Sequence, residues 1–306
     1  MKKLSIAAGM MAGTMALALA GCGGAPSSSS EASSAASDST SAAGTTADSA
    51  ATAEGTYPED VQAIIDRGVL RVGVKNAVIG FGYQDPATSE YSGMEIDIAK
   101  KIADTLGVDV EYTAVTAATR TELLDSGDID CVLATFTITD ERKQSWDFTT
   151  PYYTDHVTVL VEDASGIKGL ADLKDKKVGV SSGSTSAKAL VKAMIEKGVL
   201  TGDGFDEETF DPATWTDGIT FQQFDDYPSI STALSAGQID AFCVDKSILA
   251  VYHTDGRSYI EDEFAPQEYG IATKKGSGFS AVCEDLVTTW LSDGTIDGLI
   301  DTYKLG

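Results

Sequence analysis

The order of predicted strands and helices constrains this 306-residue chain more than any other feature of its sequence. Short runs of branched apolar residues predict three strands, at 69–74, 108–112 and 131–135. Helices are predicted between them at 95–106 and 119–126, each followed by a glycine that ends it. A strand–helix series of this kind predicts a parallel sheet covered by helices on both faces.

The same pattern then begins again further along the chain. The predicted strands are 177–180, 219–224 and 241–244. The predicted helices are 184–196, capped by Ser or Thr, a helix that starts at Tyr227 with Pro228 in its first turn, and 246–252. Residues 124–130 and 234–240 share a motif in which a helix stop is followed by Ile-Asp and a buried strand. Two similar α/β lobes are therefore predicted, each a mainly parallel sheet flanked by helices.

Two extended segments rich in β-formers, 155–161 and 264–273, are predicted to connect the lobes. The segment 279–303 is predicted to be helical and to return to the first lobe. The domain prediction assigns residues 57–154 and 267–306 to lobe 1 and 155–266 to lobe 2. In open α/β sheets, ligands bind beyond the carboxyl ends of the strands, so these ends are expected to line one shared cleft.

The N-terminus combines a secretion signal with a lipid-attachment site. Lys2 and Lys3 precede an apolar run at 4–20 that is too short for a membrane span. Leu-Ala-Gly-Cys at 19–22 resembles the lipobox of bacterial lipoproteins, although an ordinary signal peptide with a coincidental cysteine is the alternative. We expect a signal peptide at 1–21, a lipid on Cys22 and a Ser/Ala-rich flexible tether over 22–56. The body would then lie at the cell membrane, facing outside the cytoplasm.

Composition excludes several functions. The formal net charge of −25 disfavours binding to nucleic acid, which requires basic patches. Cys131, Cys243 and Cys283 are too widely spaced for a disulfide framework, and the first two lie in apolar runs and are predicted to be buried, although one disulfide stays possible. No cluster of residues has the spacing of a metal site, and neither a metal nor a cofactor is expected.

Polar and charged residues follow the predicted strands and are the candidates for the site. They are Lys75, 116–120 with Arg120, 135–142 with Thr135, Thr137 and Arg142, 181–185 with Thr185, 225–227 with Tyr227, and Asp245. An arginine fork and a helix start both suit a carboxylate, and an aspartate suits an ammonium. A ligand that carries both groups is an amino acid.

Each of these residues also has a structural interpretation. Arg142 in Thr-Asp-Glu-Arg-Lys is equally consistent with an exposed helix charge, and Arg120 with a solvated one. Asp245 is consistent with the N-cap of the helix that follows it, and Tyr227 with core packing. Lys75 is consistent with the end of a strand. Spacing alone does not decide between these alternatives.

Two further stretches change this balance. Residues 134–143, Ala-Thr-Phe-Thr-Ile-Thr-Asp-Glu-Arg-Lys, and 147–153, Asp-Phe-Thr-Thr-Pro-Tyr-Tyr, resemble the signature of family 3 solute-binding proteins, which serve ABC importers of polar amino acids. Gly-Met-Glu-Ile-Asp at 93–97 resembles the family's Gly-Phe-Asp-x-Asp motif, with Met94 and Glu95 as departures. The stretches 115–120, 224–230 and 244–249 are most similar to the aspartate/glutamate-binding branch.

The resemblance implies a two-lobed type II periplasmic-binding-protein-like fold that closes on one amino acid. It implies that Arg142, Thr137 and Thr185 bind the α-carboxylate, that Asp245 and Tyr227 lie at the ammonium, and that Lys75, Arg120 and Thr135 surround a side-chain carboxylate. An aromatic residue near Val78 that neutral-ligand binders often use is absent, and Phe81 is left as a possible wall of the site. Three cations and Asp245 give the site a charge of +2, which favours aspartate or glutamate.

The resemblance further implies a non-enzymatic, monomeric binding protein that delivers its ligand to an ABC permease. Glutamine and cystine are the alternative ligands. A dehydratase on the same fold is a rival hypothesis, with Glu95 as the one candidate acid. A sensory domain that signals on binding is the other rival.

Overall fold

The computed structural model describes residues 57–306; the predicted signal peptide, Cys22 and the whole of the predicted tether lie outside this range. Helix α1 (Glu59–Arg67) leads into a five-stranded sheet with the order β5-β1-β6-β14-β7. Its strands are β1 (Val69–Val74), β5 (Asp109–Ala114), β6 (Cys131–Leu133), β7 (Trp146–Phe148) and β14 (Ala272–Lys274). Strand β1 is parallel to β5 and β6, and β14 is antiparallel to its two neighbours. We call the part built around this sheet lobe 1.

Helices cover both faces of the first sheet, because its strands carry apolar side chains on both faces that must be buried. Helix α2 (Met94–Leu106) and the C-terminal helices α8 (Gly278–Ser292) and α9 (Thr295–Tyr303) share a core with Val72 and Cys131. The opposite face packs on α3 (Arg120–Ser126) through Leu124 and Val132. Helix α4 (Asp140–Ser145) precedes β7, and a small antiparallel sheet is made by β2 (Ala77–Val78), β3 (Gly82–Gln84) and β4 (Tyr91–Ser92).

A second sheet has the order β10-β9-β11-β8-β12, and we call the part built around it lobe 2. Its strands are β8 (Tyr153–Glu162), β9 (Lys176–Ser181), β10 (Ile219–Phe224), β11 (Ala241–Asp245) and β12 (Arg257–Tyr259). Strands β10, β9 and β11 are parallel, and β8 is antiparallel to β11. The 3₁₀ turns η1 (Asp163–Ser165) and η2 (Leu170–Leu173) follow β8.

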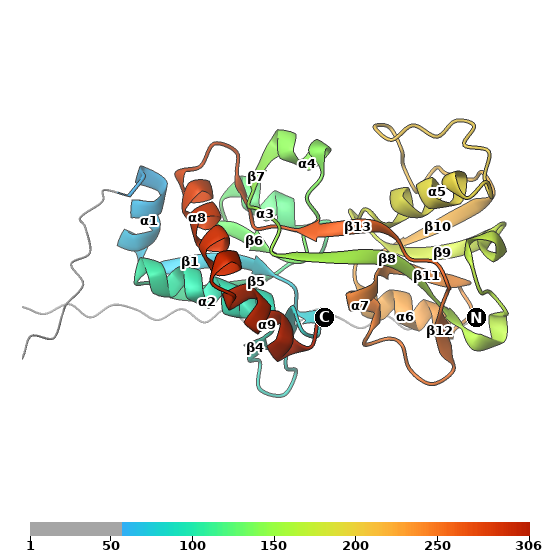
Figure 1. Cartoon of the computed structure of the whole chain (residues 1–306), viewed down its shortest axis with the longest axis horizontal. Helices are drawn as coiled ribbons and strands as arrows, with labels where there is room; N and C mark the ends of the chain where they lie inside the picture. The colour runs from blue at the N-terminus through green and yellow to red at the C-terminus, as the bar shows by residue number, and fades with distance from the viewer. Residues whose placement is uncertain (1–56) are drawn as a thin grey trace, which may run out of the picture. The chain divides into compact units, whose positions relative to one another are not determined.

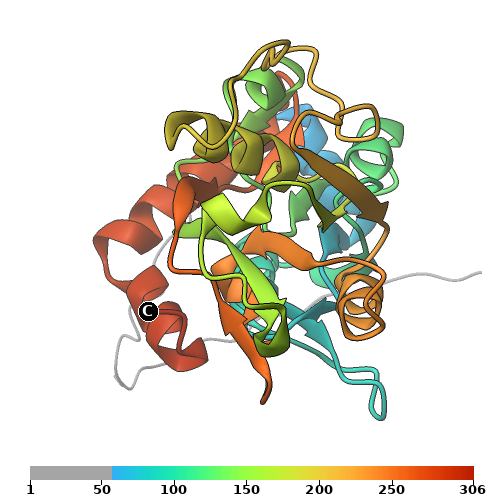
Figure 2. The same cartoon turned by 90° about the vertical axis from the view of Figure 1, so that its right-hand side faces the viewer.

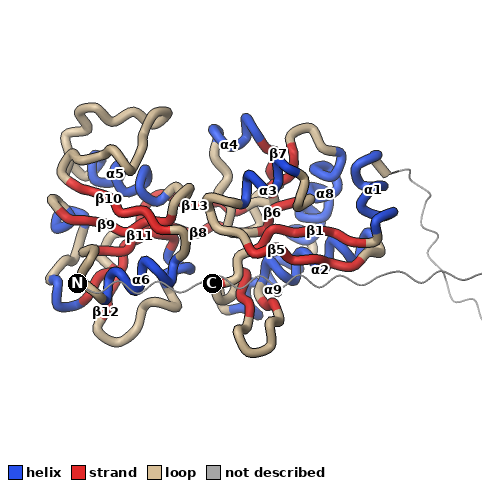
Figure 3. Tube along the Cα trace, turned by 180° about the vertical axis from the view of Figure 1, so that it is seen from behind, coloured by secondary structure: helices blue, strands red, loops and turns tan. Residues whose placement is uncertain are grey.

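The two faces of this second sheet follow the alternation of a strand. Val157, Val159 and Val161 of β8 face the core of α5 (Ser186–Glu196), while Leu160 faces that of α6 (Tyr227–Ser235) and α7 (Lys246–Leu249). Figures 1 and 3 show α5 and α6 on opposite sides of the sheet.

Two long strands join the lobes. Strand β13 (Phe264–Tyr269) pairs antiparallel with β8, and the two run side by side from one sheet toward the other (Figure 1). Strand β8 crosses the predicted lobe boundary at 154/155 and β13 crosses the one at 266/267, so each strand passes once from one lobe to the other. The predicted connecting segments 155–161 and 264–273 are therefore strands for most of their length.

The C-terminal helices return to lobe 1 as the sequence predicts (red in Figures 1 and 2). The hydroxyl of Tyr303 donates to Asp97 Oδ2 of α2 at 2.6 Å, and the carbonyl oxygen of Leu305 accepts from the Tyr153 hydroxyl at 2.7 Å. The predicted helix 279–303 is interrupted at Gly294, whose φ of 79° lies in the left-handed region.

Three local predictions need correction. Helix α7 ends at Leu249 rather than 252. The strand predicted to reach Thr135 ends at Leu133. Helix α5 begins at Ser186 and has no side-chain cap, although a Ser/Thr cap was expected. Cys131, Cys243 and Cys283 are free and buried, which agrees with the prediction that the first two act as small apolar side chains.

Candidate functional site

The eight predicted binding residues come from the carboxyl ends of strands in both lobes. Lys75 follows β1, Asp245 ends β11, and the others lie in the loops and helix starts that follow strands. Six of them are buried, and the other two, Arg142 and Thr185, are half-buried. The buried ones are Lys75, Arg120, Thr135, Thr137, Tyr227 and Asp245, each at most 6% exposed. Hydrogen bonds and ring contacts described below join Arg120, Arg142, Thr135, Thr137 and Thr185, and the charges of Lys75 and Asp245 lie close enough to interact with those of the two arginines.

Two guanidinium groups pack on one aromatic ring. Arg120 Cζ lies 3.8 Å and Arg142 Cζ 4.7 Å from the centroid of the Phe136 ring. The face of the ring attracts both cations and allows them to lie near each other. Burial lowers the pKa of Arg120 to about 10, and burial together with Arg120 lowers that of Arg142 to about 9. Both therefore carry their charge at neutral pH.

Arg142 links the two lobes. Its backbone N–H donates to the hydroxyl of the N-cap Thr139 at 3.1 Å, which starts α4. Its Nη1 donates to the carbonyl oxygen of Thr137 at 2.7 Å and its Nη2 to that of Gly183, in lobe 2, at 3.2 Å. The alternative that Arg142 is a solvated helix charge therefore does not describe this structure.

The contact at Gly183 depends on the absence of a side chain. Gly183 has φ 73°, and a Cβ at this position would lie 2.9 Å from the carbonyl oxygen of Ala117 in lobe 1. Only glycine combines this backbone conformation with so close an approach.

Arg120 organises the loop after β6. Its Nη1 donates to the carbonyl oxygens of Ala134 and Thr135 at 2.9 and 3.2 Å. Thr135 has φ 45°, a left-handed conformation that costs a β-branched residue about 1–3 kcal/mol. Its N–H donates to Glu95 Oε1 at 2.6 Å, and this bond and the guanidinium hold the loop in place.

Glu95 changes the expected charge of the site. Its side chain is fully buried in the first turn of α2, and Oε1 also accepts from the Tyr152 hydroxyl at 2.6 Å. Burial raises the pKa of Glu95, while Tyr152, Thr135, Lys75 and Arg120 oppose this rise. Counted as ionised, Glu95 reduces the predicted charge of +2 to +1. The same contacts give it a role that the dehydratase hypothesis did not consider, as an anchor for the Thr135 loop.

Lys75 lies beside this carboxylate and Tyr227. Its Nζ is 5.4 Å from the centroid of the Tyr227 ring. Burial, reinforced by Arg120, lowers the pKa of Lys75 to about 7, even though Glu95 and Asp245 favour its charged form. Tyr227 also stacks on Phe242 with 6.5 Å between the ring centroids, which agrees with its interpretation as a packing residue.

Asp245 is held by a tyrosine of β13. The Tyr269 hydroxyl donates to Asp245 Oδ2 at 2.5 Å and lies 3.3 Å from Asp155 Oδ2. Burial and the nearby Asp155 raise the pKa of Asp245 to about 7. Asp245 occupies the N-cap position of α7, but its side chain makes no capping hydrogen bond there. It faces the site instead.

Sequence reasoning missed Gln267, which joins Thr137 to Thr185. Both threonine hydroxyls donate to Gln267 Oε1, at 2.8 and 2.7 Å. It also missed Phe136 and Tyr269. The sequence predicts segment 264–273 only as a connection between the lobes, and its one signal for the site is the strand alternation that puts Gln267 and Tyr269 on the same face. Phe81, a possible wall of the site in the sequence analysis, is fully buried, and its ring meets that of Tyr269 edge-on with 5.7 Å between the centroids.

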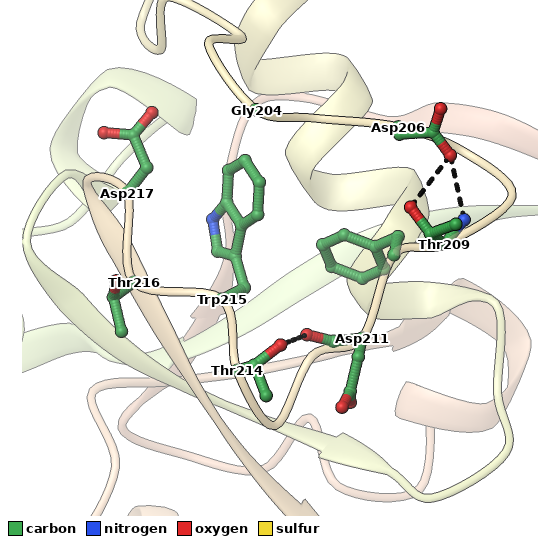
Figure 4. Close-up of a pocket in the computed structure, with 9 residues that line it drawn as sticks. Gly204, Asp206, Thr209, Asp211, Thr214, Trp215, Thr216 and Asp217 are labelled. Atoms are coloured by element: carbon green, nitrogen blue, oxygen red, sulfur yellow. Dashed lines mark hydrogen bonds between the residues drawn. The ribbon is translucent and has the colours of Figure 1, made fainter.

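A separate pocket of about 280 Å³ lies in the loop between α5 and β10 (Figure 4). The ring of Phe210 lies 5.6 Å from that of Trp215, and Asp206 Oδ1 accepts from the backbone N–H and hydroxyl of Thr209. None of the predicted binding residues lines this pocket, and the Asp206 carboxylate caps its own loop.

Within residues 57–306, no helix has both the length and the apolar character needed to cross a bilayer. The same part of the chain contains no group of three His, Cys, Asp or Glu side chains arranged to hold a metal ion.

Comparison with known proteins agrees with this geometry. A model of the bacterial extracellular solute-binding proteins, family 3, matches residues 70–304. The chain belongs to this family. The match covers both sheets and both connecting strands, and it therefore includes every residue of the network described above.

Individual relatives show how varied the ligands of this family are. The Bacillus subtilis (strain 168) ABC transporter glutamine-binding protein GlnH is 34% identical over 255 residues, which cover 80% of this chain and 84% of that protein. The Corynebacterium glutamicum glutamate-binding protein GluB is 32% identical and covers 80% and 81%. An ancestral arginine-binding protein bound to arginine has a TM-score of 0.65, with 32% identity over 78% of this chain and 98% of that one. This solute-binding protein thus has the two-lobed type II fold that its sequence predicts.

Proposed function

We propose that this protein captures aspartate or glutamate between its lobes and delivers it to the permease of an ABC importer. The observation that carries the proposal is the placement of Arg142 and Asp245 on opposite lobes, close enough for the charge of Arg142 to act on the pKa of Asp245. An α-carboxylate at Arg142 and an α-ammonium at Asp245 are satisfied together only when the lobes approach each other. Ligand binding therefore stabilises the closed form.

The side-chain preference follows from the remaining charges. Arg120 lies close enough to Lys75 to lower the pKa of that lysine. With Glu95 ionised the site carries +1, and a ligand of charge −1 brings it to neutrality. A neutral ligand leaves a buried cation without a partner, which costs affinity. We further propose that lipid on Cys22 tethers the monomeric protein to the cell surface, with 22–56 as the spacer.

Glutamine is the second candidate ligand, and specific observations favour it. Glu95 already supplies a carboxylate near Lys75 and Arg120, which weakens the demand for a second one. A relative named for glutamine binding is 34% identical to this chain. The side-chain amide of a glutamine ligand would donate to an acceptor such as Glu95 Oε2, which has no hydrogen-bond partner among residues 57–306.

A thermal-shift screen of the twenty amino acids against the purified full-length protein tests the proposal. At a fixed ligand concentration, the amino acid with the lowest Kd stabilises the protein most, by about 2.7 kcal/mol at 100 times its Kd. Aspartate or glutamate is therefore expected to give the largest rise in Tm. A largest rise with glutamine would select the second candidate. No rise with any amino acid would overturn the proposed function.

Lys75→Met is expected to separate the two candidates. No protein hydrogen bond to Lys75 Nζ is found in residues 57–306, so the substitution removes a charge and leaves the loops intact. Glutamate affinity is expected to fall by about 10- to 100-fold, with glutamine affinity changed less than about threefold. Titration calorimetry with both ligands measures this, and Lys168→Met on the exposed surface is the control. Equal losses for the two ligands would contradict the acidic preference.

A further inference from the structure

Strand β13 presents two polar side chains to the site. Gln267 and Tyr269 are two residues apart, so they share one face of the strand, while the exposed Glu268 points the other way. Gln267 is 4% exposed and Tyr269 is fully buried. Each one contacts groups that the proposed function assigns to the amino acid ligand.

Gln267 uses the donors assigned to the α-carboxylate. Its Oε1 accepts from the hydroxyls of Thr137 in lobe 1 and Thr185 in lobe 2. A threonine hydroxyl has one proton, so neither can donate to a ligand at the same time. Gln267 Nε2 donates to the carbonyl oxygens of Ala265 and Pro266 at 2.9 and 3.3 Å, which fixes the amide with its oxygen toward the threonines.

Tyr269 uses the acceptor assigned to the α-ammonium. Its single hydroxyl proton goes to Asp245 Oδ2 at 2.5 Å. The ring is fixed by Tyr153, which stacks on it at 5.8 Å, and by the edge of Phe81. One strand therefore places a hydrogen-bond acceptor at the carboxylate end of the site and a donor at its ammonium end.

We propose that Gln267 and Tyr269 are an internal mimic of the amino acid and compete with it for the site. This inference rests on the proposed function. The mimic is neutral. The ligand offers a carboxylate, whose hydrogen bonds are about twice as strong as those of the Gln267 amide oxygen, and an ammonium, which forms an ion pair with Asp245 that the Tyr269 hydroxyl cannot form. The ligand therefore displaces the mimic. The apparent affinity for the ligand equals its intrinsic affinity multiplied by the fraction of protein in which the mimic leaves the site free.

Two substitutions at Gln267 test the mimic, because competition predicts opposite effects. Gln267→Met keeps the length of the side chain and removes the acceptor, so affinity for the best amino acid of the screen is expected to rise about tenfold. Gln267→Glu makes the acceptor charged and the competitor stronger, so affinity is expected to fall by at least tenfold. A purely structural role of Gln267 predicts that both substitutions weaken binding.

Stopped-flow kinetics on the full-length protein provide the second measurement. For Gln267→Met, competition predicts about tenfold faster association with unchanged dissociation, since Gln267 holds the hydroxyls only before the ligand arrives. Gln223→Met, on the exposed side of β10, is the matched control and is expected to leave both rates unchanged.

Unchanged or weaker binding by Gln267→Met, or faster dissociation, overturns the mimic. This result is distinct from failure of the proposed function, which is recognised by a wild-type protein that binds no amino acid. Tyr269→Phe is the second variant. At pH 8, where Asp245 is ionised, it is expected to associate about threefold faster, and slower association would likewise count against the mimic.

Discussion

Asp245→Asn is expected to weaken amino acid binding by two to three orders of magnitude and to stabilise the protein at the same time. Asp245 is 5% exposed and supplies the one carboxylate that we assign to the ligand ammonium. Removing one partner of a buried charge pair costs about 3–5 kcal/mol, which equals this loss of affinity. Titration calorimetry measures it.

The gain in stability has a definite pH dependence. The pKa of Asp245 is raised from 3.8 to about 7 in the folded protein, so the folded state holds its proton more tightly than the unfolded state. The cost of burying Asp245 therefore grows between about pH 4 and 7, where the unfolded state releases a proton that the folded state keeps, and it is complete above pH 7. Asparagine removes this cost, about 4 kcal/mol at pH 8, and keeps a hydrogen bond to Tyr269.

Scanning calorimetry at two pH values provides the measurement. A rise in Tm of about 10 °C is expected at pH 8. Little rise is expected at pH 4, where the wild-type carboxyl is protonated in the folded state and only about half ionised in the unfolded state. The exposed Asp255→Asn is the control and is expected to change neither quantity. An Asp245→Asn variant that binds normally would remove this residue from the site.

The second large effect is a difference between the pH profiles of two ligands. Lys75 and Asp245 both have a pKa of about 7, one lowered and one raised by burial. Below this pH, Asp245 becomes neutral and no longer forms an ion pair with the ammonium group of any amino acid ligand. Above this pH, Lys75 becomes neutral, and only ligands that carry a side-chain carboxylate bind more weakly.

Glutamate affinity is therefore expected to peak near pH 7 and to fall by up to about tenfold for each pH unit on either side. Glutamine affinity is expected to rise toward pH 7 and then to level off. Calorimetric titrations from pH 5 to 9 measure both profiles. Lys75→Met is expected to remove the alkaline decline of glutamate, and a decline of equal size in that variant would show that another group causes it.

The fold could be predicted from local signals because each element has its own. Strand β1 spans Val69–Val74 and β10 spans Ile219–Phe224, as the apolar runs predict. Glycines end α2 and α3 in the left-handed conformation that the stop signals indicate. The helix boundaries were less accurate, as at Leu249, because the last turn depends on tertiary contacts.

The site could be predicted in part because strand ends identify it. All eight residues proposed from the sequence lie at the carboxyl ends of strands, but the sequence does not predict their contacts with Gln267, Phe136 and Tyr269. Gln267 meets Thr137 across 130 positions of sequence, and Phe136 meets Arg120 by a stacking contact that no spacing rule encodes. Glu95 was considered only as a rival acid, since its contact with Thr135 depends on the φ of 45° at that residue.

The pairing of β13 with β8 offers a way to detect when a ligand binds between the lobes. Because Gln267 and Tyr269 belong to a strand that joins the lobes, a solute that replaces them acts on the hinge itself. Glu268 lies between them and turns its exposed side chain outward. A fluorescent dye attached there would sense the exchange at close range without obstructing it, which makes this position a natural choice for a biosensor of extracellular amino acids.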